Sequence, residues 1–396
     1  MRHRYFLIRL LGAGVATLAA ARPGLAATPR PIAPIGGALA PIPAGADLLF
    51  VVGGDNRPTG RNAPMPRVTK QIFSEIGMIR PDFVLWSGDV VYGYGDTPAE
   101  LAREYDRFAE TAALAHAPLF DAPGNHEIHH RDGEPCEDRA SETEFRRRFG
   151  ALYGAFDAGG AHFIALDTAQ VCSEDRLDAE QRSWLEADLE AHRSARAIFV
   201  FSHTEFFSSP TIDPDAGKGH PAIQDRDGLI ALFRKYPVRA VFSGHEHVYW
   251  REAHDGIDYF VAGGGGAPLY APPERGGFSH YVVVRLSGDV LTYDVVEPGH
   301  LYVEAGPDLR GKPTTWIVNG NDADIPLRGA EISAPASLGP CRTLAARSDL
   351  RKSDGTPVPV PVSVRGCASG ARGRQAILSL TSPRGTSVPV TLRHSR

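Results

Sequence analysis

Five short polar clusters in this chain each follow directly on an apolar, strand-like run. Among their residues are two aspartates, a tyrosine three positions after the second aspartate, an asparagine and three histidines. In an open α/β sheet, ligands bind at the edge where strands end in loops, so these side chains are expected to share one site. This set of oxygen and nitrogen donors is large enough for two metal ions. The clusters are Asp55-Asn56-Arg57, Gly88-Asp89-Val90-Val91-Tyr92, Gly124-Asn125-His126-Glu127, Ser202-His203 and Gly244-His245-Glu246-His247.

The apolar runs before these clusters predict the strands that position them. They cover residues 48–52, 83–86, 118–120, 197–201 and 240–242. Helical patterns lie between them, near 69–79 and at 223–236. Thr97 and Glu100 form a capping-box pattern with Pro98 at the first helical position, and Ser141 and Asp178 each begin a similar pattern. The alternation predicts an α/β fold.

After residue 258 the pattern changes to successive strands, at 259–262, 280–286 and 291–296. Shorter β-like segments among Pro and Gly follow, at 314–318, 358–364, 376–380 and 387–392. They predict a small β-rich C-terminal domain, and the alternative is a disordered tail. Residues 263–266 are four glycines without the lysine or helix of a phosphate-binding loop, so they predict a tight turn.

Composition limits the classes of partner. The chain has 396 residues, 42% of them hydrophobic, a formal charge of -5 and a pI near 6.3. It can therefore bury a full core and a smaller second unit, but it offers no basic surface for nucleic acid. An anionic substrate must be held by local charges such as metals or a single arginine.

The first 26 residues read as an export signal, with Arg2 and Arg4 before a mostly apolar stretch and small residues near Ala26. The alternative is an uncleaved anchor, although Arg9 interrupts the apolar stretch. We expect a signal peptide at 1–26, a linker at 27–46, a catalytic domain at 47–297 and a β-rich domain at 298–396. The product is expected to be secreted or periplasmic, without stable membrane insertion after the signal is removed.

Four cysteines fit an oxidising compartment. Cys136, Cys172, Cys341 and Cys367 allow three pairings. Proximity favours Cys136 with Cys172 and Cys341 with Cys367. None of them has the spacing of a metal site.

The clusters carry a resemblance to a known family. Asp55, the Gly-Asp-x-x-Tyr motif, Gly-Asn-His-Glu, Ser-His-x-x-Phe-Phe and Gly-His-x-His-x-Tyr resemble the motifs of the calcineurin-like metallophosphoesterase superfamily. Tyr92 and the string from Gly244 to Arg251 resemble its purple acid phosphatase branch. The resemblance covers about residues 48–297. It implies an α/β fold in which a β-sandwich is flanked by helices.

The resemblance also implies ligand roles. Asp55, Asp89, Tyr92 and His247 would surround one metal, and Asp89 would bridge to a second metal held by Asn125, His203 and His245. The metals would be iron with zinc, manganese or a second iron. A hydroxide bridging two such ions would attack phosphorus in line, without a covalent enzyme intermediate.

Arg57 stands where the superfamily more commonly has the histidine of an Asp-x-His motif. A guanidinium stays protonated and does not bind a metal, so this position cannot supply a ligand. Tyr92 would then supply the missing ligand. Arg57 either forks onto a phosphate oxygen or is an ordinary surface or ion-paired arginine. His126 is the candidate proton donor to the leaving group or clamp on the transition state, and His220 is a candidate substrate-pocket residue.

The sequence therefore predicts a secreted, dinuclear-metal phosphatase that favours phosphomonoesters as small substrates. Phosphodiester or nucleotide hydrolysis at the same site is one alternative. A non-catalytic protein that binds a partner through the C-terminal domain is the other. Retention of the whole ligand set favours the enzyme. Sequence alone does not decide the natural substrate or the oligomeric state.

Overall fold

The computed structural model describes residues 31–94, 97–128, 140–170, 173–210, 212, 223–308, 311–352, 354, 356–370 and 373–394. The predicted signal peptide lies outside these residues, as do His220, Cys136 and Cys172. Residues 31–46, predicted to be a linker, lie along the N-terminal half of the molecule: Ile35 forms a β-bridge with Leu119, and Ile32 is buried.

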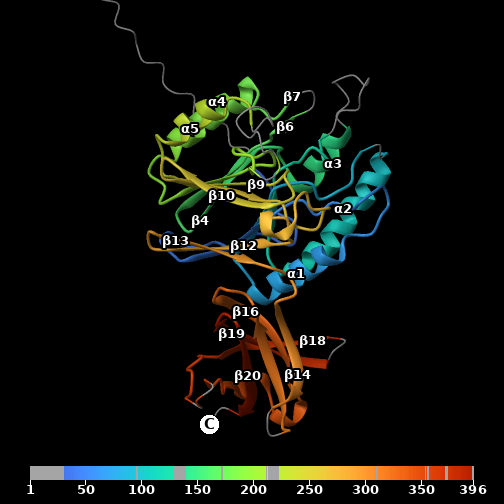
Figure 1. Ribbon diagram of the computed structural model, residues 1–396, viewed down its shortest axis with the longest axis vertical. Coiled ribbons are helices and arrows are strands. Elements are labelled where there is room, and N and C mark those ends of the chain that lie inside the picture. The colour runs from blue at the N-terminus through green and yellow to red at the C-terminus, as the bar shows by residue number, and fades with distance from the viewer. Residues whose placement is uncertain are drawn as a thin grey trace, which may run out of the picture.

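Two β-sheets form the N-terminal half (Figure 1). The first has the order β13-β12-β1-β2-β3, and the second has the order β10-β11-β9-β8-β5-β4. The first contains β1 (Leu48–Gly53), β2 (Phe83–Trp86), β3 (Leu119–Asp121), β12 (Tyr281–Ser287) and β13 (Val290–Val296). The second contains β4 (Gly154–Ala158), β5 (Ala161–Ala165), β8 (Ile198–Phe201), β9 (Val238–Ser243), β10 (Tyr249–His254) and β11 (Ile257–Ala262). The central strands of both sheets are parallel.

Side-chain alternation along the strands explains why the two sheets stack. In β1, Phe50 points into the space between the sheets, where its ring lies 5.3 Å from that of Phe199 on β8. Its neighbour Val51 belongs to the core on the outer face, together with Phe73 and Ile76. Successive side chains of a strand point to opposite faces, so each central strand is buried on both sides.

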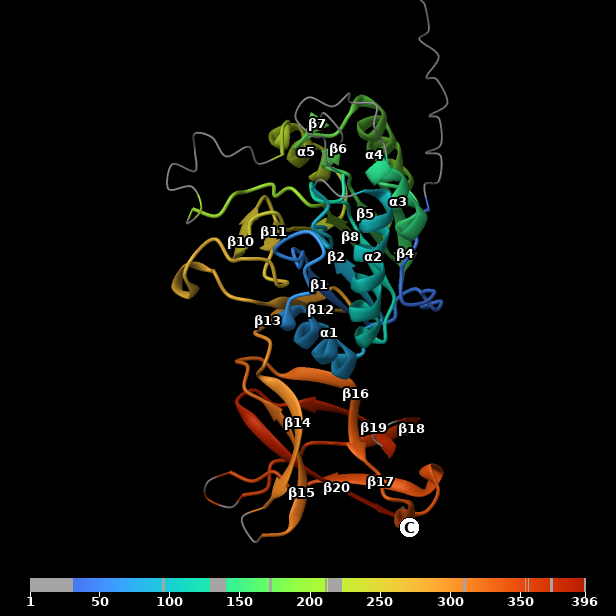
Figure 2. The same cartoon turned by 90° about the vertical axis from the view of Figure 1, so that its right-hand side faces the viewer.

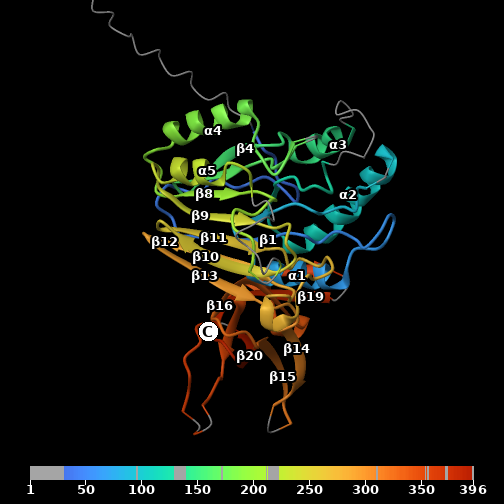
Figure 3. The ribbon, with the colours of Figure 1, turned by 45° about the horizontal axis from the view of Figure 1, so that its top comes forward.

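Helices cover the outer faces of both sheets. They are α1 (Arg67–Ile79), α2 (Pro98–Ala112), α3 (Ala140–Phe149), α4 (Ala179–Ala191) and α5 (Arg226–Phe233). The α4 and α5 helices lie on the side of the second sheet away from the C-terminal strands (Figure 3). The predicted capping box is present at Thr97 and Glu100, and Asp178 caps α4. The α5 helix is shorter than the predicted 223–236: it begins at Arg226 and ends at Phe233, and residues 234–236 form turns after it. Short elements are β6 (Ala169–Gln170), β7 (Ser173–Glu174), η1 (Ala113–Ala115) and η2 (Pro273–Arg275).

The C-terminal region is β-rich, as predicted, and its strands form two sheets. One sheet has the order β14-β15-β20-β17 and the other β16-β19-β18. Their strands are β14 (Leu301–Pro307), β15 (Pro313–Asn319), β16 (Ile325–Ser333), β17 (Leu344–Ser348), β18 (Ser363–Gly370), β19 (Gly373–Ser382) and β20 (Thr386–His394), with short turns η3 (Ala336–Leu338) and η4 (Cys341–Thr343). The predicted strand at 358–364 is wrong over 358–362, where Pro359 and Pro361 lack the N–H that a sheet requires. The predicted disulfide joins Cys341 to Cys367.

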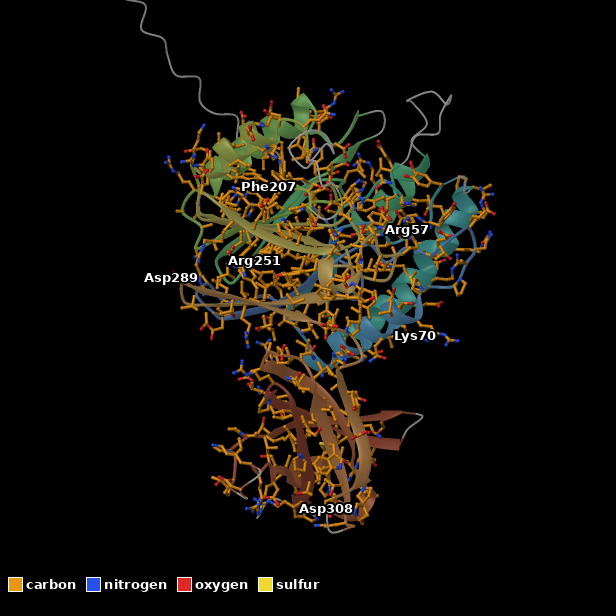
Figure 4. All side chains as sticks on the ribbon, in the orientation of Figure 1. Arg57, Lys70, Phe207, Arg251, Asp289 and Asp308 are labelled. Carbon is orange, nitrogen blue, oxygen red and sulfur yellow. A yellow bond between two sulfur atoms is a disulfide. The ribbon has the colours of Figure 1, made fainter. Side chains whose placement is uncertain are left out.

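The C-terminal sheets contact the N-terminal half through β16 and α1 (Figure 2). Arg328 on β16 forms an ion pair with Asp82 at 2.8 Å, and the backbone N–H of Gly299 donates to Glu75 of α1. The polar clusters lie far from the tip of the C-terminal region, as the positions of Arg57 and Asp308 in Figure 4 show. Among the described residues, no helix combines the length and the apolar character needed to cross a bilayer.

Candidate metal centre

The ends of five strands, from both sheets, bring the polar clusters together. Asp55 follows β1, Asp89 follows β2 and Asn125 follows β3, while His203 follows β8 and both His245 and His247 follow β9. Each of these six side chains approaches at least one other member of the set. The structure therefore brings these six strand-end side chains together.

The first group of donors consists of Asp55, Asp89 and His247. Each is buried, and one candidate ligand atom from each lies within 4.8 Å of the others. His247 donates from Nδ1 to the carbonyl of Pro268 at 2.6 Å. Because a carbonyl only accepts, the proton stays on Nδ1, and Nε2 presents a lone pair 3.5 Å from Asp55 Oδ1.

The second group consists of Asn125, His203 and His245. Asn125 Oδ1 lies 2.8 Å from His203 Nε2 and 3.1 Å from His245 Nδ1, and the two nitrogens are 3.1 Å apart. His203 donates from Nδ1 to the carbonyl of Ser87, so Nε2 is the nitrogen that faces the cluster and could bind a metal. Three acceptor atoms at these separations resemble the edges of a metal's coordination sphere.

Asp89 connects the two groups. Its Oδ1 lies 3.5 Å from His203 Nε2, and it belongs to the first group through Asp55 and His247. Burial alone would raise the pKa of Asp89, but the positive charges of His203, His126, His245 and Arg57 lower it overall. Burial opposes protonation of His203, yet Asp89 and Asp55 raise its pKa to about 9. This donor set therefore demands positive charge, and its mixture of carboxylate, imidazole and amide donors fits two metal ions.

Strained backbone and missing side chains let the donors converge. Asp55, Asp89 and His245 have φ of 61°, 56° and 68°, in the left-handed region that few residues adopt. A Cβ on Gly244 would lie 2.1 Å from Asp55 Oδ2, and one on Gly263 would lie 2.1 Å from the carbonyl of Glu246. The glycines at 263–266 therefore form a closely packed turn against the site, consistent with the predicted turn.

Glu127 holds the loops after β2 and β3 together. It is fully buried, and its carboxylate accepts from the N–H groups of Asp89, Val90, Val91 and Gly124 at 2.7 to 3.2 Å. Burial and the charge of Asp89 raise its pKa to about 7, against the effect of these donors. The acid next to His126 thus positions the backbone of the Asp89 and Asn125 loops.

His126 lies beside this cluster. Its side chain is nearly buried, its Nδ1 contacts the carbonyl of Tyr92, and its Nε2 is 3.8 Å from Asp89 Oδ2. Burial lowers its pKa, and the negative charge of Asp89 opposes this effect. With Nδ1–H bound to a carbonyl, Nε2 is the nitrogen that can exchange a proton with a group held at the cluster.

The structure also brings Arg57 to the cluster. Its Nε is buried, lies 3.6 Å from Asp89 Oδ2 and has no hydrogen-bond partner among the described residues. Arg57 is therefore not a surface arginine: it is ion-paired with Asp89, as one of the two interpretations expected, and its Nε–H is still available to donate to a phosphoryl oxygen. Tyr92 is half-buried, with its ring centroid 6.0 Å from that of His126. Metal ligation by its hydroxyl stays a prediction.

Two further tyrosines, which the strand-end motifs do not include, contact the cluster. The ring of Tyr94 lies 4.2 Å from that of His126, and its hydroxyl accepts from the Asn125 amide. The ring of Tyr270 stacks on His247 at 4.1 Å, and its hydroxyl is hydrogen-bonded to the Arg57 side chain. Their positions just after β2 and in the loop after β11, at the same sheet edge as the clusters, are the signal that identifies them.

Comparisons with known proteins agree with this geometry. The family model described as calcineurin-like phosphoesterase matches residues 46–249, more than half of the chain. The chain is 28% identical over 214 residues to the serine/threonine-protein phosphatase CPPED1 of Danio rerio, covering 51% of this chain and 66% of that protein. It is 28% identical over 205 residues to acid phosphatase type 7 of Mus musculus, covering 47% of this chain and 43% of that one. The matched part thus spans less than two thirds of these relatives.

A solved structure shares the fold. The purple acid phosphatase PPD1 from yellow lupin (Lupinus luteus) seeds matches with a TM-score of 0.52 and 18% identity. The match covers 65% of this chain and 53% of that one.

Proposed function

The chain belongs to the calcineurin-like phosphoesterase family, and from this premise we propose that it is a dinuclear-metal phosphatase that hydrolyses phosphate monoesters. The observation that carries the proposal is the position of Asp89, shared between two groups of converging donors. A carboxylate that faces both groups suits two cations better than one.

The proposed ligands follow from the two groups. Asp55, Asp89 and His247 would hold one ion, with Tyr92 as the further ligand, and Asn125, His203, His245 and Asp89 would hold the other. When bound, two such ions supply a water of lowered pKa and neutralise the charge of phosphoryl oxygens. Ligation by the Tyr92 phenolate would favour iron at the first position, with zinc, manganese or iron at the second.

The other residues have roles that their contacts support. Arg57 is placed to donate its unpaired N–H to a phosphoryl oxygen. His126 is placed to give a proton from Nε2 to the leaving oxygen, while its Nδ1 stays anchored to the carbonyl of Tyr92. Glu127 keeps the Asp89 and Asn125 loops at a fixed separation. All the proposed ligands precede residue 298, which supports the division into a catalytic domain at 47–297 and a separate C-terminal domain.

The composition of residues 1–26 supports export of the enzyme to a secreted or periplasmic location. The N-terminal sequence of the exported protein tests this proposal, since the expected first residue is Ala27. An intact Met1 in that fraction would contradict it.

The experiment that tests the function combines metal analysis with turnover. Purified protein is expected to bind two metals per chain and to release phosphate from p-nitrophenyl phosphate faster than it cleaves bis-(p-nitrophenyl) phosphate. Asp89→Ala is expected to lose metal from both positions and, with the metals, its turnover. Asp227→Ala, whose carboxylate is 88% exposed, is the matched control and should leave both unchanged.

A folded Asp89→Ala protein that still binds two metals would contradict the proposed role of this residue. Wild-type protein with two metals but no hydrolysis of either ester would refute the phosphatase proposal and favour a binding protein.

A further inference from the structure

Exposed aromatic side chains gather at the candidate metal centre. Within the described residues, the large hydrophobic side chains that are exposed are Tyr94, Leu269, Tyr270, Val290 and Tyr302. Three of these five lie in the two loops that border the cluster. Exposed apolar surface that collects in one place marks a binding surface, whereas scattered exposed residues need no explanation.

On one side of the cluster, Tyr94 lies over His126. Its ring centroid is 4.2 Å from the imidazole, its hydroxyl contacts the amide of Asn125, and the side chain remains 39% exposed. The ring is thus fixed at both its face and its hydroxyl. Such a ring loses little conformational freedom when a ligand packs against it.

Tyr270 has the same arrangement with different partners. Its ring is nearly parallel to His247, at 4.1 Å and 23°, and its hydroxyl is bonded to Arg57. The side chain is 51% exposed. The backbone fixes this loop as well, since Tyr270 N–H donates to the carbonyl of His247 and Ala267 N–H donates to that of Asp55.

The two tyrosines are the ends of one continuous line of contacts. Tyr94 contacts His126, whose Nε2 lies 3.8 Å from Asp89. The Nε of Arg57 lies 3.6 Å from the same carboxylate, and another part of the Arg57 guanidinium is hydrogen-bonded to the Tyr270 hydroxyl. Both rings therefore belong to the surroundings of Asp89 and Arg57, where the proposed function places the phosphate. The leaving group of a phosphate ester bound there comes within reach of one or both rings.

We propose that Tyr94 and Tyr270 form an aromatic mouth that binds a planar aromatic ring on the leaving group, so that the preferred substrates are aryl or nucleoside phosphate monoesters. This inference rests on the proposed phosphatase function. Neither ring is needed to hold phosphate or metal. Their exposed surfaces can instead stack against an aromatic group. Such contacts favour offset or edge-to-face geometry, with ring centroids about 4.5 to 7 Å apart.

A matched pair of substrates isolates the contact with the ring. Adenosine 5′-monophosphate and ribose 5-phosphate both release a primary 5′-alcohol, so the chemistry of the leaving group is the same and only the base differs. We expect wild-type protein to prefer adenosine 5′-monophosphate by roughly tenfold in kcat/KM, the scale of one or two aromatic contacts. The second pair is phosphotyrosine and phosphoserine, which tests an aryl ring. The two leaving groups differ in chemistry, so the ratio of the two kcat/KM values is compared between wild type and variant, and that difference cancels.

The variants separate the ring from the hydroxyl. Tyr94→Ala and Tyr270→Ala should each reduce the preference by about two- to tenfold, the usual contribution of one aromatic contact. Tyr94→Phe and Tyr270→Phe keep the ring and should keep the preference. Tyr302→Ala removes a tyrosine that is 38% exposed in the C-terminal region, and it is the matched control.

The outcomes divide clearly. A reduced preference in one arm only identifies the source of the ring, nucleoside or aryl. Equal kcat/KM for both members of each pair, or a preference unchanged in both alanine variants, overturns the inference while leaving the phosphatase function standing. If no substrate is hydrolysed, the phosphatase proposal is refuted, and calorimetry with adenosine 5′-monophosphate then tests the aromatic mouth separately. A Kd raised severalfold in the alanine variants supports the mouth, and an unchanged Kd overturns it.

Discussion

Asp188→Asn is expected to destabilise the protein in a manner that depends on pH. His162 on β5 is almost fully buried, with its Nε2 2.7 Å from Asp188 of α4 and its Nδ1 2.8 Å from Asp157 of β4. The histidine therefore joins helix α4 to the edge of the second sheet, two strands from the loop that carries His203. Burial opposes protonation of His162, but hydrogen bonds to the two carboxylates outweigh it and raise its pKa.

The sign of the effect follows from the direction of that shift. A raised pKa in the folded state means that folding favours the protonated imidazole. The stability it contributes is fully present below the ordinary pKa of about 6.5, and it is lost as pH rises through the raised folded value. Asparagine keeps an acceptor at position 188 but removes its charge. Because hydrogen bonds to charged groups contribute about 1.5–3 kcal/mol, Asp188→Asn should lose roughly that amount at pH 5.5 and less than about 1 kcal/mol at pH 9.

Asp157→Asn is the matched control, because it removes the other carboxylate from the same ring. Its side chain is 66% exposed, compared with 9% for Asp188, so solvent screens it and the expected loss is about 0–1 kcal/mol. Urea unfolding followed by circular dichroism at 222 nm measures both variants, since every α-helix of the described residues lies between residues 67 and 233. Equal losses in the two variants, or a loss at pH 9 as large as that at pH 5.5, would refute the reasoning.

Two further predictions concern the candidate metal centre. His126→Ala should lower kcat by about a hundredfold or more with metal content intact, because a general acid contributes about that much; unchanged turnover across the pH profile would exclude this role. Tyr92→Phe should abolish the visible tyrosinate absorption of iron-loaded protein, because only a phenolate gives that band. A band that persists in this variant, or its absence from the iron-loaded wild type, would make Tyr92 a packing residue.

Much of the fold follows from local patterns. The strands after which the clusters lie were predicted within two residues at each end, because alternating or continuous apolar runs bounded by polar loops are local properties of the chain. The capping box at Thr97 was predicted for the same reason. Strands β4, β5, β6, β7, β10, β14, β16 and β17 were not predicted. In β10, for example, side chains are only half-buried, so the apolar signal is weak.

The order of the five clusters and the direction of each strand were enough to place six donor side chains at one edge, because every parallel strand delivers the residues after it to the same side of its sheet. Only the tertiary structure decided the surroundings of those donors. Glu127 receives N–H groups from two separate loops, Pro268 selects the tautomer of His247, and Tyr94 and Tyr270 meet the cluster from loops about 175 residues apart. Such contacts depend on how two sheets stack and on the path of the loops between them, and no local pattern in a chain encodes distances of that kind.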